Sequence, residues 1–155
     1  MATISQKITP FLWYDNQAEE AARFYTSIFK NSKIVSTMPG PGGTVMGVSF
    51  ILDGTEFQAL NGGPQFKFTE AISLFVKCGT QAEVDELWKK LTADGGRESM
   101  CGWLKDKYGL SWQIIPTVLG ELFADKDREK ANRAMQAMLK MKKIDIAGLK
   151  EAFNG

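Results

Sequence analysis

The amino-acid sequence states one series of structural patterns twice. A strand, an amphipathic helix and a run of strands are predicted within residues 4–62, and a similar series follows within residues 68–116. A sheet and a helix joined in this order bury their apolar faces against each other. The sequence therefore predicts an α+β fold of paired βαβββ modules, within a single domain over residues 1–155. Paired modules of this kind usually enclose a cavity between curved sheets.

The first module is predicted from alternating apolar residues and from a helix-capping signal. Alternation over residues 8–14 predicts a strand with Thr9, Phe11 and Trp13 on one face. Asn16 is a favourable N-cap residue for the helix that follows. The later elements predicted for this module are a helix over 17–29 and strands over 33–38, 44–52 and 55–61.

The last two strands of the first module form a predicted hairpin. Asp53-Gly54, between them, is a dipeptide typical of a tight two-residue turn. Along the second arm, alternation places Gln58 and Asn61 on opposite faces.

The second module repeats the order of the first. Thr80 with Glu83 makes a capping box at the start of a helix that ends at Gly95-Gly96. Apolar residues inside this helix recur at helical spacing. The strands predicted around it span residues 71–77, 98–101, 103–107 and 110–115.

A different pattern follows over residues 117–155. Apolar residues recur at helical spacing within 118–123 and 127–142, and a short apolar surface lies within 144–153. Methionines in the middle stretch provide an adaptable packing surface. The sequence predicts C-terminal helices that pack on the protein's own sheet or on a second subunit.

Composition and charge exclude several classes of protein. The 155 residues have a formal net charge of +1, so neither nucleic acid nor an anionic membrane surface is an expected partner. No apolar run approaches the roughly 18 residues that span a bilayer. The polar stretch over residues 1–7 lacks the pattern of a secretory signal. Two cysteines, Cys78 and Cys101, are too few for a disulfide scaffold, and we expect both to be reduced in a cytoplasmic protein.

The chain contains no histidine. Histidine is the commonest general base near neutral pH and the commonest ligand of zinc, copper and iron. Without it, Ser-His-Asp and Cys-His catalytic arrangements are excluded. Lysine, carboxylate, tyrosine or thiolate groups remain as candidates, and no cofactor is predicted. A reactive Cys101 would need nearby cations or a helix N-terminus, and we expect an inert thiol.

Five stretches of the chain are specific in combination. They are ITPFLWYDNQAEEAARFYTSIF (8–29), FQALNGGP (57–64), AISLFVKC (71–78), YGLSWQIIP (108–116) and the tail MQAMLKMKKIDIAGL (135–149). Together they resemble the PhnB-like family, often labelled 3-demethylubiquinone methyltransferase-like. That family belongs to the vicinal oxygen chelate, or glyoxalase-like, superfamily. The resemblance covers most of the chain.

The resemblance implies a homodimer in which each chain has two βαβββ modules whose sheets curve around a cavity. In relatives that use a metal ion, the ligands come from inward positions on the first and last strands of the modules. The corresponding positions here are near Thr9, Gln58, Ser73 and Gln113, with Pro10 as an alternative to Thr9. Their side chains are neutral oxygen donors, whereas zinc, iron and nickel sites use imidazole, thiolate or carboxylate. We therefore predict no metal site at these positions.

Two alternatives remain for the chemistry. Glu56 shares a face with Gln58 if the strand is regular, so it could supply a carboxylate to a metal ion. A solvated charge beside the hairpin turn is the other interpretation of Glu56. The commonest adenosylmethionine-binding unit has a glycine-rich loop between a strand and a helix, and no such segment occurs here at suitable spacing.

The predicted cavity is lined by aromatic and neutral polar side chains. Aromatic residues on strands, beside amides and hydroxyls, suit a flat and moderately polar organic molecule. Filling the space between sheet and helix is the other interpretation of each aromatic residue. The predicted pocket residues are Thr9, Phe11, Trp13, Gln58, Asn61, Ser73, Trp103, Trp112 and Gln113.

Three functions remain open at this point. The main prediction is a glyoxalase-like homodimer that binds a small organic molecule of unknown identity without a metal ion. The second is a metal-dependent lyase, isomerase or dioxygenase of the same superfamily. The third is an interaction protein whose cavity is filled by its own side chains. Fold alone does not decide among them.

Overall fold

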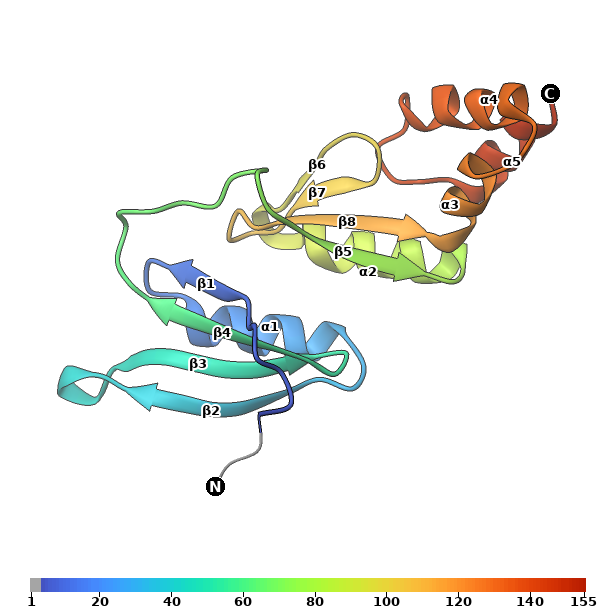
Figure 1. Ribbon diagram of the computed structural model, residues 1–155. Helices are drawn as coiled ribbons and strands as arrows, with labels where there is room; N and C mark the ends of the chain where they lie inside the picture. Colours follow the sequence, from blue (N-terminus) through green and yellow to red (C-terminus); the bar gives the residue numbers. More distant parts are fainter. Residues whose placement is uncertain (1–3) are drawn as a thin grey trace. The chain divides into compact units, whose positions relative to one another are not determined.

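The computed structural model describes residues 4–155, in which the chain divides into two compact units. Unit 1 ends at Phe68, and unit 2 spans Thr69–Gly155. The first three residues of the predicted polar stretch 1–7 lie outside the described residues. Each unit contains one four-stranded sheet with a helix along one face (Figure 1). Within residues 4–155, none of the helices is both long and apolar enough to cross a membrane.

Unit 1 contains the predicted strand, helix and three strands. β1 is parallel to β4, and the other neighbouring strands are antiparallel, in the order β1-β4-β3-β2. Asp53 and Gly54 have φ angles of 47° and 79°, so the predicted hairpin turn is confirmed. The elements are β1 (Phe11–Tyr14), α1 (Ala18–Ile28), β2 (Lys33–Pro39), a 3₁₀ turn (Pro41–Gly43), β3 (Val45–Leu52) and β4 (Thr55–Asn61).

The start of α1 is capped by a residue that sequence reasoning did not choose. Asn16 was predicted as the N-cap, but the cap position is Gln17, and its side chain makes no capping hydrogen bond. The backbone N–H of Ala18 instead donates to Oδ1 of Asn61, at 2.8 Å. The Asn61 Nδ2 donates to the carbonyl of Val45, also at 2.8 Å. The prediction was wrong because a side chain from β4 reaches the helix start and satisfies the first free N–H group.

The core of unit 1 lies between α1 and one face of its sheet. Small residues on the helix allow close approach, and Tyr25 and Phe50 pack there with tilted rings 6.3 Å apart. The hydroxyl groups of Tyr14 and Tyr25 lie 3.0 Å apart and form a buried hydrogen bond. The buried residues of α1 are Ala18, Ala21, Ala22 and Tyr25.

Unit 2 repeats this arrangement in the order β5-β8-β7-β6, with β5 parallel to β8. The capping box is present, because Oγ1 of Thr80 accepts from the N–H of Glu83 at 3.2 Å. The Glu83 carboxylate in turn accepts from the N–H of Gly79, at 2.8 Å. The elements are β5 (Ser73–Cys78), α2 (Gln81–Thr92), a 3₁₀ turn (Ala93–Gly95), β6 (Arg97–Glu98), β7 (Trp103–Lys105) and β8 (Ser111–Pro116).

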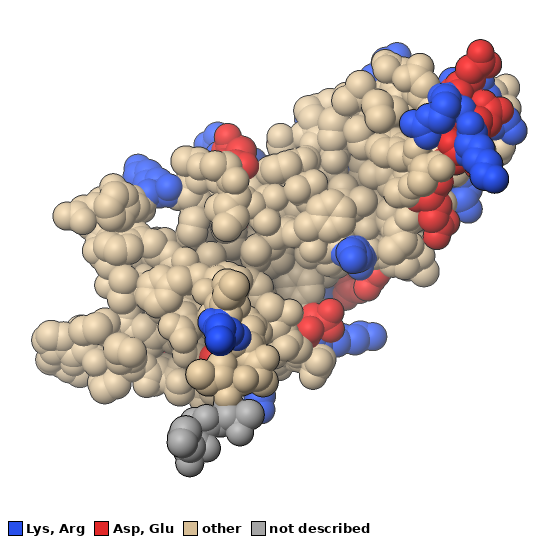
Figure 2. All heavy atoms as spheres, in the orientation of Figure 1, with Lys and Arg blue, Asp and Glu red and all other residues tan. Residues whose placement is uncertain are grey.

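Three further helices follow in unit 2, as the sequence predicted: α3 (Thr117–Phe123), α4 (Arg128–Met138) and α5 (Ile146–Asn154). Their buried core contains Leu119, Ile144 and Leu149 together with Ile115 of β8. The helix predicted over 127–142 ends early, because residues 141 and 142 accept backbone hydrogen bonds from Cys101 and Gly102. On the face drawn in Figure 2, basic and acidic side chains gather side by side over these helices.

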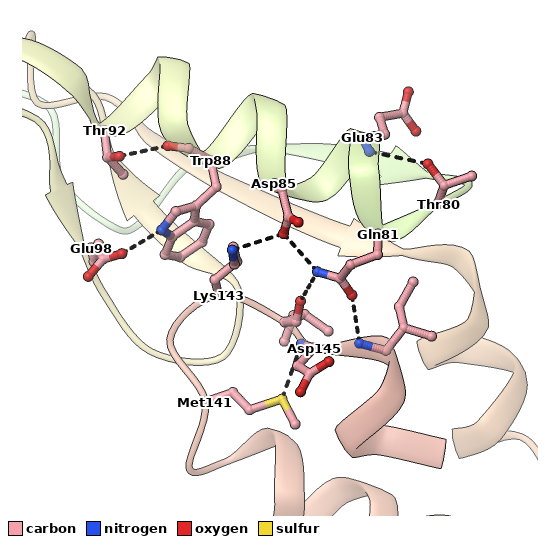
Figure 3. Close-up of polar contacts among 12 residues, drawn as sticks. Thr80, Gln81, Glu83, Asp85, Trp88, Thr92, Glu98, Met141, Lys143 and Asp145 are labelled. Carbon is pink, nitrogen blue, oxygen red and sulfur yellow. Dashed lines mark hydrogen bonds and ion pairs between the residues drawn. The ribbon is translucent and has the colours of Figure 1, made fainter. Parts of the chain in front are cut away.

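The side chain of Gln81 joins α2 to the segment before α5 (Figure 3). Its Nε2 donates to the carbonyl of Ile144 at 3.0 Å, and its Oε1 accepts from the N–H of Ile146 at 2.8 Å. The same Nε2 donates to Asp85 at 2.9 Å, and Lys143 pairs with Asp85 at 2.9 Å. Hydrogen bonds from Lys143 and then Gln81 lower the pKa of Asp85. These polar bonds attach the segment before α5 to α2, in addition to the apolar contacts that the C-terminal helices make with Ile115 of β8.

Replacing Gln81 by Ala tests this attachment. The change removes three hydrogen bonds, and we expect it to lower the free energy of unfolding by about 1–3 kcal/mol, measured by urea denaturation. The control is Gln136→Ala on the exposed side of α4, expected to change it by less than about 0.5 kcal/mol. Equal stability of the two variants would contradict the attachment.

Candidate functional site

Each sheet has one face against its helix and one face opposite, which we call the open face. In unit 1, β1 pairs with β4 so that Phe11 is opposite Gln58 and Trp13 is opposite Leu60. Their neighbours Leu12 and Tyr14 are buried against α1, so these four side chains lie on the open face. The predicted sharing of a face by Phe11, Trp13 and Gln58 is thus present in the structure.

Trp13 is held firmly at the end of β1. Its indole N–H donates to the carbonyl of Gly63 at 2.9 Å, and its ring meets Phe66 edge to face at 5.0 Å. A Cβ atom on Gly62 would overlap the indole ring, so glycine is required for this approach. The Trp13 side chain is nevertheless only partly buried on the open face.

Two other predicted pocket residues of unit 1 lie elsewhere. Thr9 is half-buried directly before β1. Asn61 lies on the face toward α1, where its Oδ1 accepts the capping bond from Ala18 and its Nδ2 donates to the Val45 carbonyl. It also lines a shallow depression of about 490 Å³ with Glu19 and Pro41. The structure therefore does not bring Asn61 to the same face as Gln58.

In unit 2, Gln113 is at the centre of the open face. It lies opposite Phe75 on β5 and opposite Trp103 on β7. The Gln113 Nε2 donates to the hydroxyl of Ser73 at 2.9 Å. Three predicted pocket residues, Ser73, Trp103 and Gln113, thus come together with Phe75, which the sequence reasoning did not select.

Trp112 lies on the other face of the same strand and is only 2% exposed. Its indole N–H donates to Oδ2 of Asp106 at 2.9 Å. The Asp106 carboxylate, itself 2% exposed, also accepts from the N–H groups of Tyr108 and Leu110. Asp106 and Trp112 therefore organise the turn before β8, on the helix side of the sheet.

A cleft of about 540 Å³ opens on unit 2, next to the open-face residues Trp103 and Gln113. Trp103 lines it, and so does Ser111, whose hydroxyl is buried without a hydrogen-bond partner among residues 4–155. Its charged lining residues are Glu70, Arg97, Glu98, Lys105, Asp106 and Lys107. The sequence alone did not predict that these charged residues share a cleft, because the pattern along one strand does not show which residues of the neighbouring strands lie beside it.

The donor groups do not fit a divalent metal ion. Thr9, Gln58, Ser73 and Gln113 offer neutral oxygens, and the Gln113 amide already donates to Ser73. Within the described part of the chain, no group of three or more Cys, Asp or Glu side chains converges as a metal site would require. Glu56 keeps the face predicted for it, and among the described residues it belongs to no group of three or more such side chains.

Both cysteines are free thiols in the structure. Burial, and then the nearby Glu83 carboxylate, raises the pKa of Cys78 to about 12. The neutral thiol is therefore the form of Cys78 present at physiological pH, as expected of a structural cysteine. Cys101 is half-buried in a tight turn with a φ angle of 61°.

The family model described as 3-demethylubiquinone-9 3-methyltransferase matches residues 6–115. The chain belongs to this family. The match includes both βαβββ modules and ends before α3. The likeness predicted for the tail is therefore not tested by this match. No protein of curated function matches the chain.

Solved structures agree with this assignment. A PhnB protein from Bacillus cereus, described as a 3-demethylubiquinone-9 3-methyltransferase, is 40% identical, with a TM-score of 0.68; the match covers 72% of this chain and 100% of that one. Protein PA1353 from Pseudomonas aeruginosa is 18% identical, with a TM-score of 0.61, over 72% and 98% of the two chains. The fosfomycin resistance protein FosX from Listeria monocytogenes is 16% identical, with a TM-score of 0.54, over 77% and 98%. The last two show the fold alone, and the predicted glyoxalase-like α+β fold is confirmed.

Proposed function

We propose that this PhnB-like protein binds a small organic molecule on the open face of unit 2, without a divalent metal ion. The observation that supports this most is the 540 Å³ cleft lined by Trp103 beside the Gln113–Ser73 hydrogen bond. Its volume is within the range usual for small-molecule sites. An aromatic ring with neutral hydrogen-bonding groups beside it can hold a flat ligand and fix its orientation. The presence of a cleft favours binding over an interaction protein whose cavity is filled.

The charges of the cleft support the absence of a divalent metal ion. Three basic and three acidic side chains line it, and each of the carboxylates, Glu70, Glu98 and Asp106, already has a partner within the chain rather than a free coordination site. The neutral donors Ser73 and Gln113 supply no compensating negative charge. A metal-dependent lyase, isomerase or dioxygenase is therefore the less favoured alternative.

The description of the family names a methyltransferase activity, which we do not adopt for this chain. The common adenosylmethionine-binding unit is a parallel sheet with a glycine-rich loop before a helix. Both sheets here are mixed, with one parallel pair each. The two free cysteines are consistent with the predicted cytoplasmic location, because cytosolic thiols stay reduced.

A ligand-observed NMR screen of flat, moderately polar fragments tests the proposed function. We expect hits whose binding weakens at least about tenfold in Trp103→Ala, because a central aromatic contact is lost. Gln113→Ala is expected to weaken binding by about fivefold through one lost hydrogen bond. Gln136→Ala on α4 is the control and should bind as the parent does. Hits that bind all of these variants equally would contradict a site on this face.

We further propose that the protein is a homodimer. Large apolar side chains are exposed on the open faces, among them Phe11 at 58%, Met38 at 59% and Phe75 at 53%. Exposed apolar groups of this size are typical of surfaces that another protein surface covers. A second copy of the chain is the partner that the family resemblance implies.

Sedimentation velocity of the untagged protein tests the dimer. We expect a single species with the mass of two chains at micromolar concentration, since burying these side chains stabilises association. A species of one chain at protein concentrations up to tens of micromolar would refute the homodimer, because this range is on the order of the dissociation constants of weak specific complexes.

A further inference from the structure

One row of side chains crosses the open face of the unit 2 sheet. Arg97 of β6 lies opposite Lys105 of β7, and Lys105 lies opposite Ser111 of β8. Ser111 in turn lies opposite Ser73 of β5. All four side chains can donate hydrogen bonds, and the first two are cations. Strand register therefore assembles a row of donors that no segment of the sequence contains.

The neighbouring residues along each strand show on which face of the sheet this row lies. The Glu98 carboxylate accepts from the indole N–H of Trp88 on α2, at 2.7 Å, so Glu98 points toward the helix. Figure 3 shows this bond at the end of α2. Since neighbouring residues of a strand point to opposite faces, Arg97 lies on the open face. Leu104, 1% exposed, places Lys105 there in the same way.

A carboxylate of the protein itself already sits at the row. Glu70, just before β5, forms an ion pair with Lys105, and both side chains are largely exposed, at 63% and 38%. Among the described residues, none forms an ion pair with the Arg97 guanidinium. The Ser111 hydroxyl, in the same row, is buried and has no partner in residues 4–155. Two of the donors in the row thus lack an acceptor that an incoming anion could supply.

We propose that the cleft takes a small organic anion, whose carboxylate or phosphoryl group replaces the Glu70 carboxylate on Lys105 and also engages Arg97 and the Ser111 hydroxyl. Exposed ion pairs contribute little, so this exchange costs little. Charge-assisted hydrogen bonds from a guanidinium are stronger and more directional than neutral ones. The Ser111 hydroxyl is only 1% exposed, so the proposal requires that opening of the Glu70–Lys105 pair lets the anion reach it. This inference rests on the proposed function and names its ligand class.

The next row of the open face indicates the rest of the ligand. Trp103, Gln113 and Phe75 lie side by side in register, two residue pairs along from Lys105 and Ser111 and on the same face. Trp103 lines the cleft together with Arg97 and Lys105. An aromatic ring or another flat apolar body attached to the anionic group would lie against Trp103. The ligand class is therefore an aromatic or similarly flat carboxylate or phosphate ester.

The test is a titration of the ¹⁵N-labelled protein with benzoate, phenyl phosphate and neutral benzamide, followed by NMR. We expect benzoate or phenyl phosphate to shift the Trp103 indole signal in a saturable way, and benzamide to bind about tenfold more weakly. The ratio of the two anion affinities distinguishes a carboxylate ligand from a phosphate ligand. Binding should weaken as salt is added, because the cations are exposed.

Three variants separate this proposal from a structural role. Arg97→Gln should weaken anion binding about tenfold, and Lys89→Gln, which removes the same charge from the exposed side of α2, should not. Glu70→Gln should strengthen it, because the internal competitor is lost; a purely structural Glu70 would give the opposite sign. Ser111→Ala should weaken binding without lowering the stability of the protein, because its hydroxyl has no partner to lose.

The outcomes distinguish this inference from the proposed function. If benzamide binds as tightly as benzoate and Arg97→Gln changes neither, the cleft binds flat molecules and the anion site is refuted, while the proposed function stands. If the fragment screen gives hits at Trp103 but neither anion binds, the anion site is also refuted. If neither the screen nor the titration gives binding at Trp103, both proposals fall.

Discussion

Each four-stranded sheet of this protein is covered by a helix on one face, and the rest of the structure depends on that one-sided cover. Strand residues such as Phe50 of β3 and Leu104 of β7 are buried on the helix side of the sheet, and their neighbours along the strand are left on the open face. Buried side chains such as Phe50 in unit 1 and Trp112 in unit 2 contribute about 1.5–3 kcal/mol each to holding helix and sheet together. The side chains on the open faces do not pack against α1 or α2. They are therefore the part of the fold available for binding.

Strand patterns, helix periodicity and capping signals were enough to predict the duplicated modules, the hairpin turn at Asp53-Gly54 and the Thr80 capping box, because each is encoded by neighbouring residues. Asn16 and Asn61 show the limit. The helix start is capped by an asparagine 43 positions from the N–H group that it binds, and no local pattern marks such a partner. The donor row Arg97–Lys105–Ser111 was missed for the same reason, since the register of three strands brings it together. Trp112 was predicted to line the pocket because of its residue type alone. In the structure its indole N–H instead donates to Asp106, in the turn between β7 and β8.

The C-terminal helices follow the part of the chain that the family model matches. The family match ends at Ile115, and 72% of this chain is enough to cover the whole of the Bacillus cereus relative. The added helices pack on Ile115, Leu119, Ile144 and Leu149 and are bonded to Gln81 and to the Cys101–Gly102 turn. That turn leads directly into β7, which carries Trp103. The hydrogen bonds from Cys101 and Gly102 to residues 141 and 142 thus hold the start of a strand that lines the cleft.

The central claim is that the open face of unit 2 binds its ligand with cationic and neutral groups and without a metal ion. The most direct measurement is elemental analysis of the untagged protein, purified without chelator, before and after incubation with zinc, nickel, manganese and ferrous ions. The account predicts essentially no bound divalent metal in either sample, because the carboxylates that line the cleft already have partners within the chain, and among the described residues no three ligating side chains converge. A content close to one ion per chain would contradict it, and would mean that carboxylates such as Glu56 do what histidine does in other metal-binding proteins.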